Sequence, residues 1–172
     1  VFSTTTTTSQ EIAWNKVPPG VEVFYCPVDS ALFVKKALRM IRPSALVIFE
    51  TEIWPNLITL SRQSGAKVIL VNARISDRSV KGYQRFRRFF SPVLDSFHRI
   101  CVQTELDRER FAAVTSKAEL TVTGNIKFDQ APPPGLQGID LAEYFGDGAV
   151  TVLACSTHAP EEKLILDSFL QA

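Results

Sequence analysis

The sequence has few cysteines and histidines, and this scarcity excludes several kinds of site. The three cysteines, Cys26, Cys101 and Cys155, lie far apart, are odd in number and form no Cys-x-x-Cys pair. They predict buried thiols in a reducing compartment rather than a disulfide framework or a zinc site. There is no Walker A or Gly-x-Gly-x-x-Gly sequence and no acid or histidine cluster with metal-ligand spacing. We therefore expect neither a metal nor another cofactor.

An excess of charge of either sign is also lacking. The 19 lysines and arginines against 18 acidic residues leave a formal net charge of +1. Nucleic-acid binding by neutralisation of many phosphates needs far more positive charge, so we expect no nucleic-acid partner. No apolar run approaches the roughly 20 residues of a membrane span, and no basic-then-apolar leader opens the sequence. The chain as given is expected to be soluble.

The chain of 172 residues, 45% of them apolar, is long enough for one complete core and the start of a second. It opens without a methionine, runs into five consecutive threonines, and stops inside an apparent helix at Ala172. We interpret both ends as cut. Residues 131–148 are rich in proline and glycine and are expected to link a first lobe, residues 1–130, to the beginning of a second, residues 149–172.

Apolar runs that alternate with amphipathic stretches predict an α/β fold. The expected strands are residues 45–49, 67–71, 99–102, 120–123 and 150–155. The expected helices are residues 29–41 with Asp29 as N-cap, 55–64, 79–97, a helix capped by Thr104 that runs to 111, and 160–170. Strands alternating with helices at this spacing form βαβ units, whose right-handed crossovers give a Rossmann-like parallel sheet.

Polar residues follow every expected strand. In an open parallel sheet, ligands bind beyond the carboxyl ends of the strands, where loops meet and helix N-termini offer free N–H groups. The residues at these positions are Glu50, Glu52, Asn72, Arg74, Gln103, Thr104 and Lys127 in the first lobe and Ser156, Thr157 and His158 in the second. Such an arrangement suits a polyhydroxylated, anionic ligand in a cleft between two lobes.

The two glutamates have alternative roles. A carboxylate that leaves an apolar strand is partly desolvated, which would strengthen its hydrogen bonds to sugar hydroxyls. Alternatively, Glu50 or Glu52 caps the helix that starts at Pro55. Residues two apart on an extended chain face opposite ways, so we take Glu50 as structural and Glu52 as facing the cleft. Trp54 either packs in the core or stacks on a sugar.

Residues 81–90 interleave four cations, Lys81, Arg85, Arg87 and Arg88, with four aromatic side chains. This stretch could rest on an anionic membrane surface or bind lipid phosphates. Alternatively it is an amphipathic helix whose residues Phe86, Phe89 and Phe90 pack on the sheet while the arginines are solvated. The two interpretations are compatible on different faces.

The histidines differ in their expected roles. His158 stands at a strand end and could act as an acid, a base or a phosphate donor. Together with Ser156 and Thr157 it precedes a helix whose N-terminal N–H groups could hold a phosphate, so this loop is the candidate site for a donor nucleotide. His98 is expected to cap or pack.

Several of these stretches resemble one family in order and spacing, the 3-deoxy-D-manno-octulosonic acid (Kdo) transferases. The similar stretches are residues 4–8, 49–57, 71–76, 82–83, 103–107 and 124–129, and the similarity resumes at Ser156-Thr157-His158 with Glu161-Glu162. The string Glu-Thr-Glu-Ile-Trp-Pro-Asn at residues 50–56 is the most specific of them. The resemblance covers residues 1 to about 130.

The resemblance implies a two-lobed GT-B glycosyltransferase whose first lobe binds the lipid A precursor and whose second lobe binds CMP-Kdo. Transfer would invert the anomeric centre without a metal, at the cytoplasmic face of the bacterial inner membrane, in lipopolysaccharide biosynthesis. Glu50 or Glu52, Asn72, Arg74 and Lys127 would line the cleft, and Ser156, Thr157 and His158 would approach the donor.

Two departures from the family pattern matter. Ala159-Pro160 stands where the family has a Gly-rich, acidic segment, which alters the local backbone donors. The family's proposed general base, a glutamate, and its membrane anchor would both lie upstream of residue 1. We therefore expect no transferase activity from this chain alone. Two other readings are a GT-B enzyme that uses a nucleoside-diphosphate sugar and a non-catalytic module that binds anionic lipid through residues 81–90.

Overall fold

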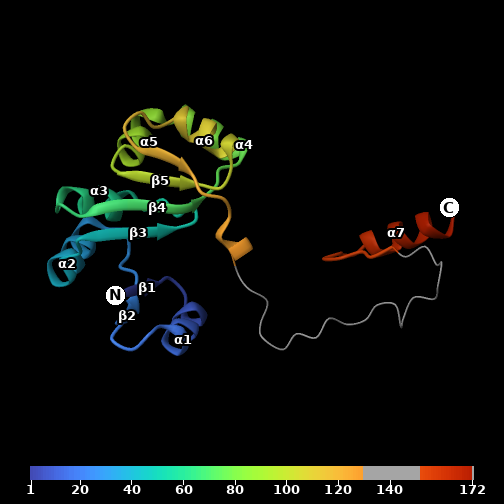
Figure 1. Ribbon diagram of the computed structural model, residues 1–172, viewed down its shortest axis with the longest axis horizontal. Helices are drawn as coiled ribbons and strands as arrows, with labels where there is room; N and C mark the ends of the chain where they lie inside the picture. Colours follow the sequence, from blue (N-terminus) through green and yellow to red (C-terminus); the bar gives the residue numbers. More distant parts are fainter. Residues whose placement is uncertain (130–151, 172) are drawn as a thin grey trace. The chain divides into compact units, whose positions relative to one another are not determined.

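The structure, a computed structural model, describes residues 1–129 and 152–171 and divides into two compact units, Val1–Gln130 and Ala131–Ala172. The first unit alternates parallel strands with helices, so the predicted α/β class is confirmed (Figure 1). The parallel pairing follows from the chain path, since each strand of the larger sheet is joined to the next through at least one helix.

The larger sheet has the strand order β3-β4-β5-β6, with all neighbours parallel. Its strands are β3 (Ala45–Phe49), β4 (Lys67–Ala73), β5 (Arg99–Val102) and β6 (Glu119–Val122). The predictions for β3 and β5 match residue by residue. β4 continues two residues beyond its predicted end, and β6 is shifted by one residue. Because all neighbouring strands are parallel, the carboxyl ends of all four lie at one edge.

The helices that connect these strands are α3 (Pro55–Gln63), α4 (Asp77–Arg85), α5 (Arg87–Leu94) and α6 (Glu105–Ala112). The prediction of a single helix over residues 79–97 is wrong. Phe86 has φ −106° and ψ 34°, outside the helical region, and it divides the stretch into α4 and α5. α4 also starts before residue 79, because the Ser76 side chain caps it by accepting a hydrogen bond from Ser79 N.

The core lies between this sheet and its helices. The largest fully buried side chains on the strands include Leu70 and Ile100, and those on the helices include Ile58, Leu94 and Phe111. They belong to one hydrophobic cluster. Burying each such side chain contributes about 1.5–3 kcal/mol, so this packing stabilises the sheet whose strand ends carry the polar residues.

The first 41 residues form β1 (Phe2–Thr4), α1 (Thr7–Lys16), β2 (Val23–Tyr25) and α2 (Ala31–Ile41). β1 and β2 pair in parallel as a separate two-stranded sheet. The sequence analysis placed no element before residue 29. The assignment of Asp29 as the cap of α2 is wrong, because the N-cap of α2 is Ser30 and the Asp29 side chain bonds to α3 instead.

In the second unit, α7 (Glu161–Leu170) confirms the predicted helix over residues 160–170 to within one residue at its start. Residues 152–155, the described part of the strand predicted over 150–155, form no strand. A strand needs a paired neighbour, and no other strand is described in this unit. The predicted linker, residues 131–148, lies outside the described residues. Within residues 1–129 and 152–171, no helix combines the length and apolar character that a bilayer span requires.

Candidate functional site

The loops that follow β3 and β5 are each hydrogen bonded to the end of β4 at the carboxyl edge of the sheet. Glu50 N donates to Val71 O (2.9 Å), and Gln103 N donates to Ala73 O (2.9 Å). Each loop therefore starts in a fixed position relative to the neighbouring strand. The side chains of the loops are presented from one continuous edge rather than from independent segments.

Asn72 joins three of these segments. Its backbone is left-handed, with φ 55°, a conformation that asparagine adopts more readily than most residues. Its side chain is 5% exposed, and Oδ1 accepts a hydrogen bond from Ile126 N (3.2 Å). Its carbonyl accepts another from Gln103 Nε2 (3.0 Å). Asn72 thus ties the end of β4 to the loops after β5 and β6.

Glu50 and Lys127 meet above this edge. Glu50 also has a left-handed backbone, with φ 58°, which turns the chain sharply at the end of β3. The Lys127 Nζ lies 3.7 Å from Glu50 Oε1, and the two side chains are 68% and 57% exposed. An exposed pair of this kind contributes about 0–1 kcal/mol to stability. Both charged groups therefore remain accessible to a ligand.

Arg74 is positioned by the loop after β3. Arg74 N donates to Thr51 Oγ1 (3.1 Å), and Thr51 Oγ1 donates to the Arg74 carbonyl in a second, short contact. The backbone of Arg74 is fixed by this pair of bonds, and its side chain is exposed. The two partners are 23 residues apart in the sequence, so this contact could not be predicted from local sequence patterns.

The loop that carries Arg74 is also held by side chains of α6. The buried carboxylate of Asp107 accepts hydrogen bonds from Ile75 N (2.9 Å) and from Thr104 Oγ1 (2.6 Å). Arg110 Nη1 donates to the carbonyl of Ile75 (2.9 Å), and its other nitrogen pairs with Asp77. The sequence analysis assigned Asp107 no part in holding this loop. The signal that could have revealed this role is a carboxylate on the same face of a short helix as the core residue Phe111.

The helix cap proposed for Glu50 or Glu52 is supplied by another residue. Asn56 N and Leu57 N at the start of α3 donate to the Asp29 carboxylate, at 3.1 Å and 2.8 Å. The capping interpretation of the two glutamates is therefore wrong for these N–H groups. Their carboxylates stay exposed at the edge of the sheet.

Glu52 lies toward β2. Burial raises the pKa of the Cys26 thiol, and the negative charges of Asp29 and Glu52 add to this rise. Glu52 is thus close enough to act on a residue that follows β2, whereas Glu50 pairs with Lys127 after β6. Trp54 is half-buried at the N-cap of α3, so the structure leaves its two interpretations open.

The three residues of the second unit form a compact turn before α7. Ser156 has a left-handed backbone with φ 56°, and His158 Nδ1 lies 3.3 Å from the Ser156 carbonyl. His158 N donates to Glu161 Oε2 (3.1 Å), and Thr157 Oγ1 donates to Glu162 Oε1 (3.2 Å). The two glutamates of the first helical turn therefore shape this loop.

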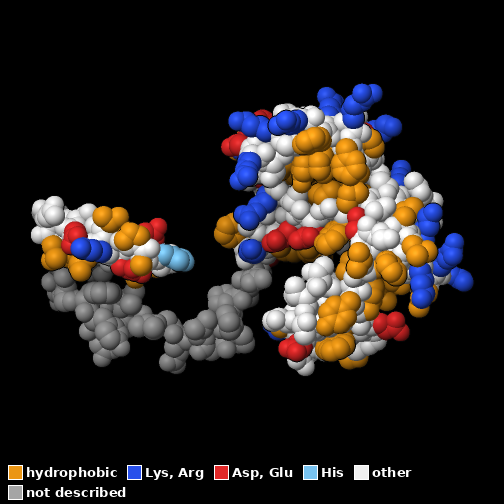
Figure 2. All heavy atoms as spheres, turned by 180° about the vertical axis from the view of Figure 1, so that it is seen from behind, with side chains coloured by type: hydrophobic (Ala, Val, Ile, Leu, Met, Phe, Trp, Pro, Cys, Tyr) orange, Lys and Arg blue, Asp and Glu red, His pale blue; other side chains and the backbone are white. Residues whose placement is uncertain are grey.

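Residues 81–90 are divided between core and surface. Phe90 is half-buried and packs on Tyr83 at a centroid distance of 4.5 Å. Phe86 and Phe89 are 58% and 56% exposed, so the expectation that they pack on the sheet is wrong. The aromatic–basic surface consists of Lys81, Arg85, Phe86, Arg87, Arg88 and Phe89, all exposed. Figure 2 shows hydrophobic side chains with lysine and arginine around them on the part of the molecule that carries α4 and α5.

His98 is part of the fold at the opposite edge of the sheet, as predicted. Its Nδ1 accepts a hydrogen bond from Val68 N (3.0 Å) and lies 3.0 Å from Arg62 Nη1. Desolvation, together with the charges of Arg62 and Lys67, lowers the pKa of His98. The neutral imidazole is therefore favoured.

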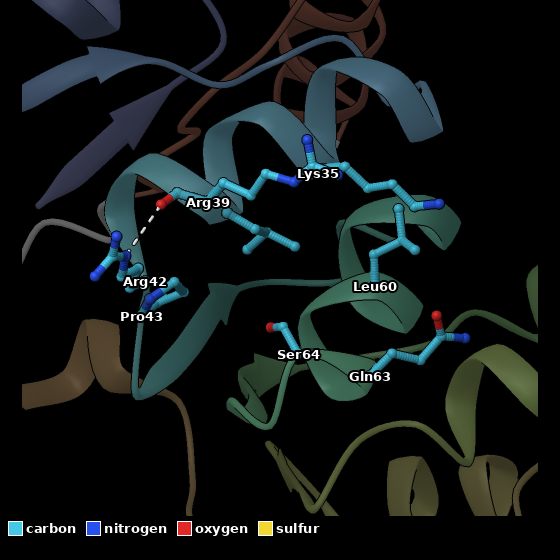
Figure 3. A pocket seen from close by; sticks show the side chains of 8 residues that line it. Lys35, Arg39, Arg42, Pro43, Leu60, Gln63 and Ser64 are labelled. Atoms are coloured by element: carbon cyan, nitrogen blue, oxygen red, sulfur yellow. Dashed lines mark hydrogen bonds between the residues drawn. The ribbon is translucent and has the colours of Figure 1, made fainter.

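A hollow of about 780 Å³ lies between α2 and α3, away from the carboxyl edge. Figure 3 shows Lys35 and Arg39 reaching over it from α2, with Leu60, Gln63 and Ser64 on the facing helix and its end. Arg42 Nε donates to the Arg39 carbonyl (3.4 Å) at the end of α2. Cations at a helix C-terminus offset the helix dipole, so this hollow has a structural explanation.

Similarity to known proteins identifies the family of this chain. The family model described as 3-deoxy-D-manno-octulosonic-acid transferase (kdotransferase) matches residues 1–130. A 3-deoxy-D-manno-octulosonic acid transferase of Rickettsia felis is 32% identical over 162 residues, which are 94% of this chain and 34% of that protein. The protein of the same name from Haemophilus influenzae is 29% identical over 170 residues, 97% of this chain and 40% of that protein.

A bifunctional glycosyltransferase/methyltransferase of Fusobacterium nucleatum is also similar, with 34% identity over 155 residues, 87% of this chain and 24% of that protein. The chain thus spans between 24% and 40% of the length of these three curated relatives.

Proposed function

Since this chain belongs to the Kdo transferase family, we propose that it is part of a glycosyltransferase that moves Kdo from CMP-Kdo to the lipid A precursor during lipopolysaccharide biosynthesis. The proposal concerns the longer protein that contains these residues. The observation that carries it is the carboxyl edge of the sheet, where Glu50, Asn72, Arg74 and Lys127 come together at or just after the ends of three strands.

The chemistry of this edge suits an acidic sugar and a phosphorylated acceptor. Arg74 and Lys127 supply exposed positive charge, which would pair with a carboxylate or a phosphate. Glu50 and Glu52 are exposed acceptors for sugar hydroxyls. The side-chain oxygen Oδ1 of Asn72 already accepts a hydrogen bond from Ile126 N. The Nδ2 group of Asn72 is therefore the one that would donate to a ligand.

The donor nucleotide is proposed to lie against Ser156, Thr157 and His158. Two of these residues are held by acids of α7, so the loop is preformed by the chain itself. His158 would donate to a phosphate oxygen of CMP as the bond to the sugar breaks. That bond is replaced by one from the acceptor hydroxyl on the opposite face, which inverts the anomeric centre and requires no metal.

The acceptor hydroxyl must lose a proton to a general base, and no residue of this edge is assigned that role. By the resemblance to the family, a glutamate that is not among residues 1–172 would be the base. We therefore propose that the chain of 172 residues has no transferase activity by itself. Transfer by this piece at the rate of an intact relative would reject the assignment.

The aromatic–basic surface would hold the protein at the cytoplasmic face of the inner membrane. Each lysine or arginine near an anionic surface contributes about 1 kcal/mol, and this surface carries four of them. Phe86 and Phe89 are exposed beside these cations and would enter the headgroup region. The protein would then encounter its lipid acceptor by diffusion along the membrane surface rather than through the bulk solution.

The test is transfer of Kdo by the complete gene product that contains these residues. With CMP-Kdo and the lipid A precursor, we expect transfer that CMP inhibits and UDP does not. Arg74→Met and Lys127→Met should each raise KM by roughly 10–100-fold, because a hydrogen bond to a charged group is worth about 1.5–3 kcal/mol. Arg108→Met is the matched control, since Arg108 is exposed on α6 and pairs with Glu105. Inhibition by UDP instead of CMP would indicate an enzyme that uses a nucleoside-diphosphate sugar.

The exposure of Phe86 and Phe89 also favours a second candidate function, a non-catalytic module that binds anionic lipid. Vesicle binding that depends on Arg87 and Arg88, in a complete gene product that transfers no sugar, would support this alternative.

A further inference from the structure

The hollow between α2 and α3 is surrounded by positive charge that no acidic side chain offsets. The residues that line it are Lys35, Leu38, Arg39, Arg42, Pro43, Leu60, Gln63 and Ser64. The stretches that build it, residues 30–49 and 53–76, contain no aspartate or glutamate, although the whole chain has 19 basic and 18 acidic residues. Among the described residues, no ion pair involves a cation of this lining. The charge around the hollow is therefore not neutralised by the chain itself.

The three cations of the lining lie on one side of α2. Lys35, Arg39 and Arg42 follow one another at spacings of four and three residues, which places them on one face of the helix and at its end. Like charges four residues apart on a helix repel each other and destabilise it. The helix dipole favours Arg39 and Arg42 near the helix end, but Lys35 lies in the middle of α2, where the dipole has little effect. The dipole therefore does not explain the whole cluster.

Arg42 has a backbone conformation that arginine rarely adopts. Its φ of 47° and ψ of 56° lie in the left-handed region, and the residue in this conformation at a helix end is usually glycine or asparagine. Its Nε makes only the long contact of 3.4 Å with the Arg39 carbonyl. The side chain is exposed, so the other two nitrogens of the guanidinium group are available to donate to a ligand.

The floor of the hollow is apolar. Leu38, Pro43 and Leu60 are half-buried, and Figure 3 shows Leu60 pointing from α3 toward α2. Gln63 is exposed at the end of α3 and adds an uncharged donor. The volume of about 780 Å³ is within the range of sites for small molecules. An apolar floor below cationic donors is complementary to an anionic amphiphile.

We propose that this hollow binds the phosphate group of an anionic phospholipid, with the adjoining part of the lipid against Leu38 and Leu60. Two arginines and a lysine supply more positive charge than one carboxylate would balance, and a guanidinium group binds two phosphate oxygens at once. The hollow lies away from the carboxyl edge of the sheet and shares no residue with the aromatic–basic surface. The proposal is therefore independent of the transfer reaction and of the membrane contact proposed above.

Binding of a short-chain phospholipid to the complete gene product tests the proposal. The probe is dihexanoyl phosphatidic acid below its critical micelle concentration, because a dissolved lipid offers no membrane for the aromatic–basic surface to bind. We expect saturable binding in isothermal titration calorimetry. Inorganic phosphate should bind roughly 10-fold more weakly or less, because it buries no CH₂ groups against the leucines. The absence of saturable lipid binding, or equal affinity for inorganic phosphate, would overturn the proposal.

Substitutions on α2 distinguish this hollow from general attraction to positive charge. Lys35→Gln and Arg39→Gln should each weaken binding of the lipid by roughly 10–100-fold, the effect of losing one hydrogen bond between charged groups. Lys36→Gln is the matched control, since Lys36 is the next residue, is also exposed and does not line this hollow. It should change the affinity by less than about 2-fold, because salt screens exposed charges. Equal losses for Lys35→Gln and Lys36→Gln would contradict a site in the hollow.

Arg42→Asn separates binding from stability. Asparagine adopts the left-handed backbone more readily than arginine, so this variant should unfold at nearly the same temperature as the wild type. Its affinity for dihexanoyl phosphatidic acid should nevertheless fall by roughly 10-fold or more, because one guanidinium group is lost. Unchanged affinity in this folded variant would also overturn the proposal.

Discussion

Replacement of Asp107 by alanine should destabilise the protein and loosen the loop that carries Arg74. The buried carboxylate of Asp107 accepts one bond from Ile75 N and one from Thr104 Oγ1. Alanine removes both acceptors and leaves the N–H of buried Ile75 without a partner. Of the two hydrogen bonds between Thr104 and Asp107 at the start of α6, alanine removes the one to the carboxylate and keeps the one from the backbone N–H of residue 107.

The magnitude follows from these two bonds. A hydrogen bond to a charged group contributes about 1.5–3 kcal/mol, so the loss of two predicts a decrease of about 3–6 kcal/mol in the free energy of unfolding. Folded domains are stable by only about 5–15 kcal/mol, so the variant should be severely destabilised. Asp107→Asn keeps an acceptor for Ile75 N and can donate to Thr104 Oγ1, and it should lose only about 1 kcal/mol.

Urea denaturation of the complete gene product measures these differences. Glu109→Ala is the matched control, since Glu109 is an exposed acid on the same helix, and it should change the free energy of unfolding by less than about 0.5 kcal/mol. The asparagine variant should remain folded, with faster amide exchange at Ile75 than in the wild type. An alanine variant as stable as Glu109→Ala would refute the assignment of Asp107 as the residue that positions this loop.

Three further predictions concern other parts of the first unit. Asp29→Ala should lower the free energy of unfolding by about 1–2 kcal/mol, measured by thermal denaturation, because α3 loses the acceptor of two N–H groups. The lowered pKa of His98 means that the unfolded chain takes up a proton before the folded chain does as the pH falls. The free energy of unfolding should therefore be constant above about pH 6.5, the ordinary histidine value, and decrease below it. In His98→Gln this decrease should be smaller, and an unchanged pH profile would contradict the role of His98. Reversal of charge at Arg87 and Arg88 together should weaken binding to anionic vesicles by about 30-fold or more, since each charge near the surface is worth about 1 kcal/mol, whereas binding to neutral vesicles should not change.

The elements with strong local signals were predicted correctly. β3 and β5 are short apolar runs bounded by polar or proline residues, and α3 begins with a proline and ends before a glycine with φ 91°. Thr104 caps α6 as expected. Such signals lie within a few residues of one another, so they can be read without knowledge of the fold.

Elements with weak local signals were missed. β1 and β2 have three residues each, too few for an alternating pattern to be recognised. The break between α4 and α5 depends on the backbone of a single residue, Phe86. The apolar run at residues 152–155 resembled a strand, although no neighbouring strand is described in its unit.

The site shows the same division. The positions of Asn72, Arg74 and Lys127 at one edge could be anticipated, because parallel strands bring their carboxyl ends together. The contacts between them could not. The sequence analysis took Glu52 as the acid facing the cleft and Glu50 as structural, whereas Glu50 is the acid that pairs with Lys127. Asp29 caps a helix 27 residues away, and the Asn72 amide bonds to a backbone N–H 54 residues away.

The sequence by itself determined the family, the α/β class and the strand ends that carry polar groups, because apolar periodicity and residue order are local properties of the chain. Only the tertiary structure decided which acid caps α3, which carboxylate pairs with Lys127 and which faces of residues 81–90 are exposed. A carboxylate takes whichever donors the folded chain brings within about 3 Å, and this choice depends on packing between distant segments.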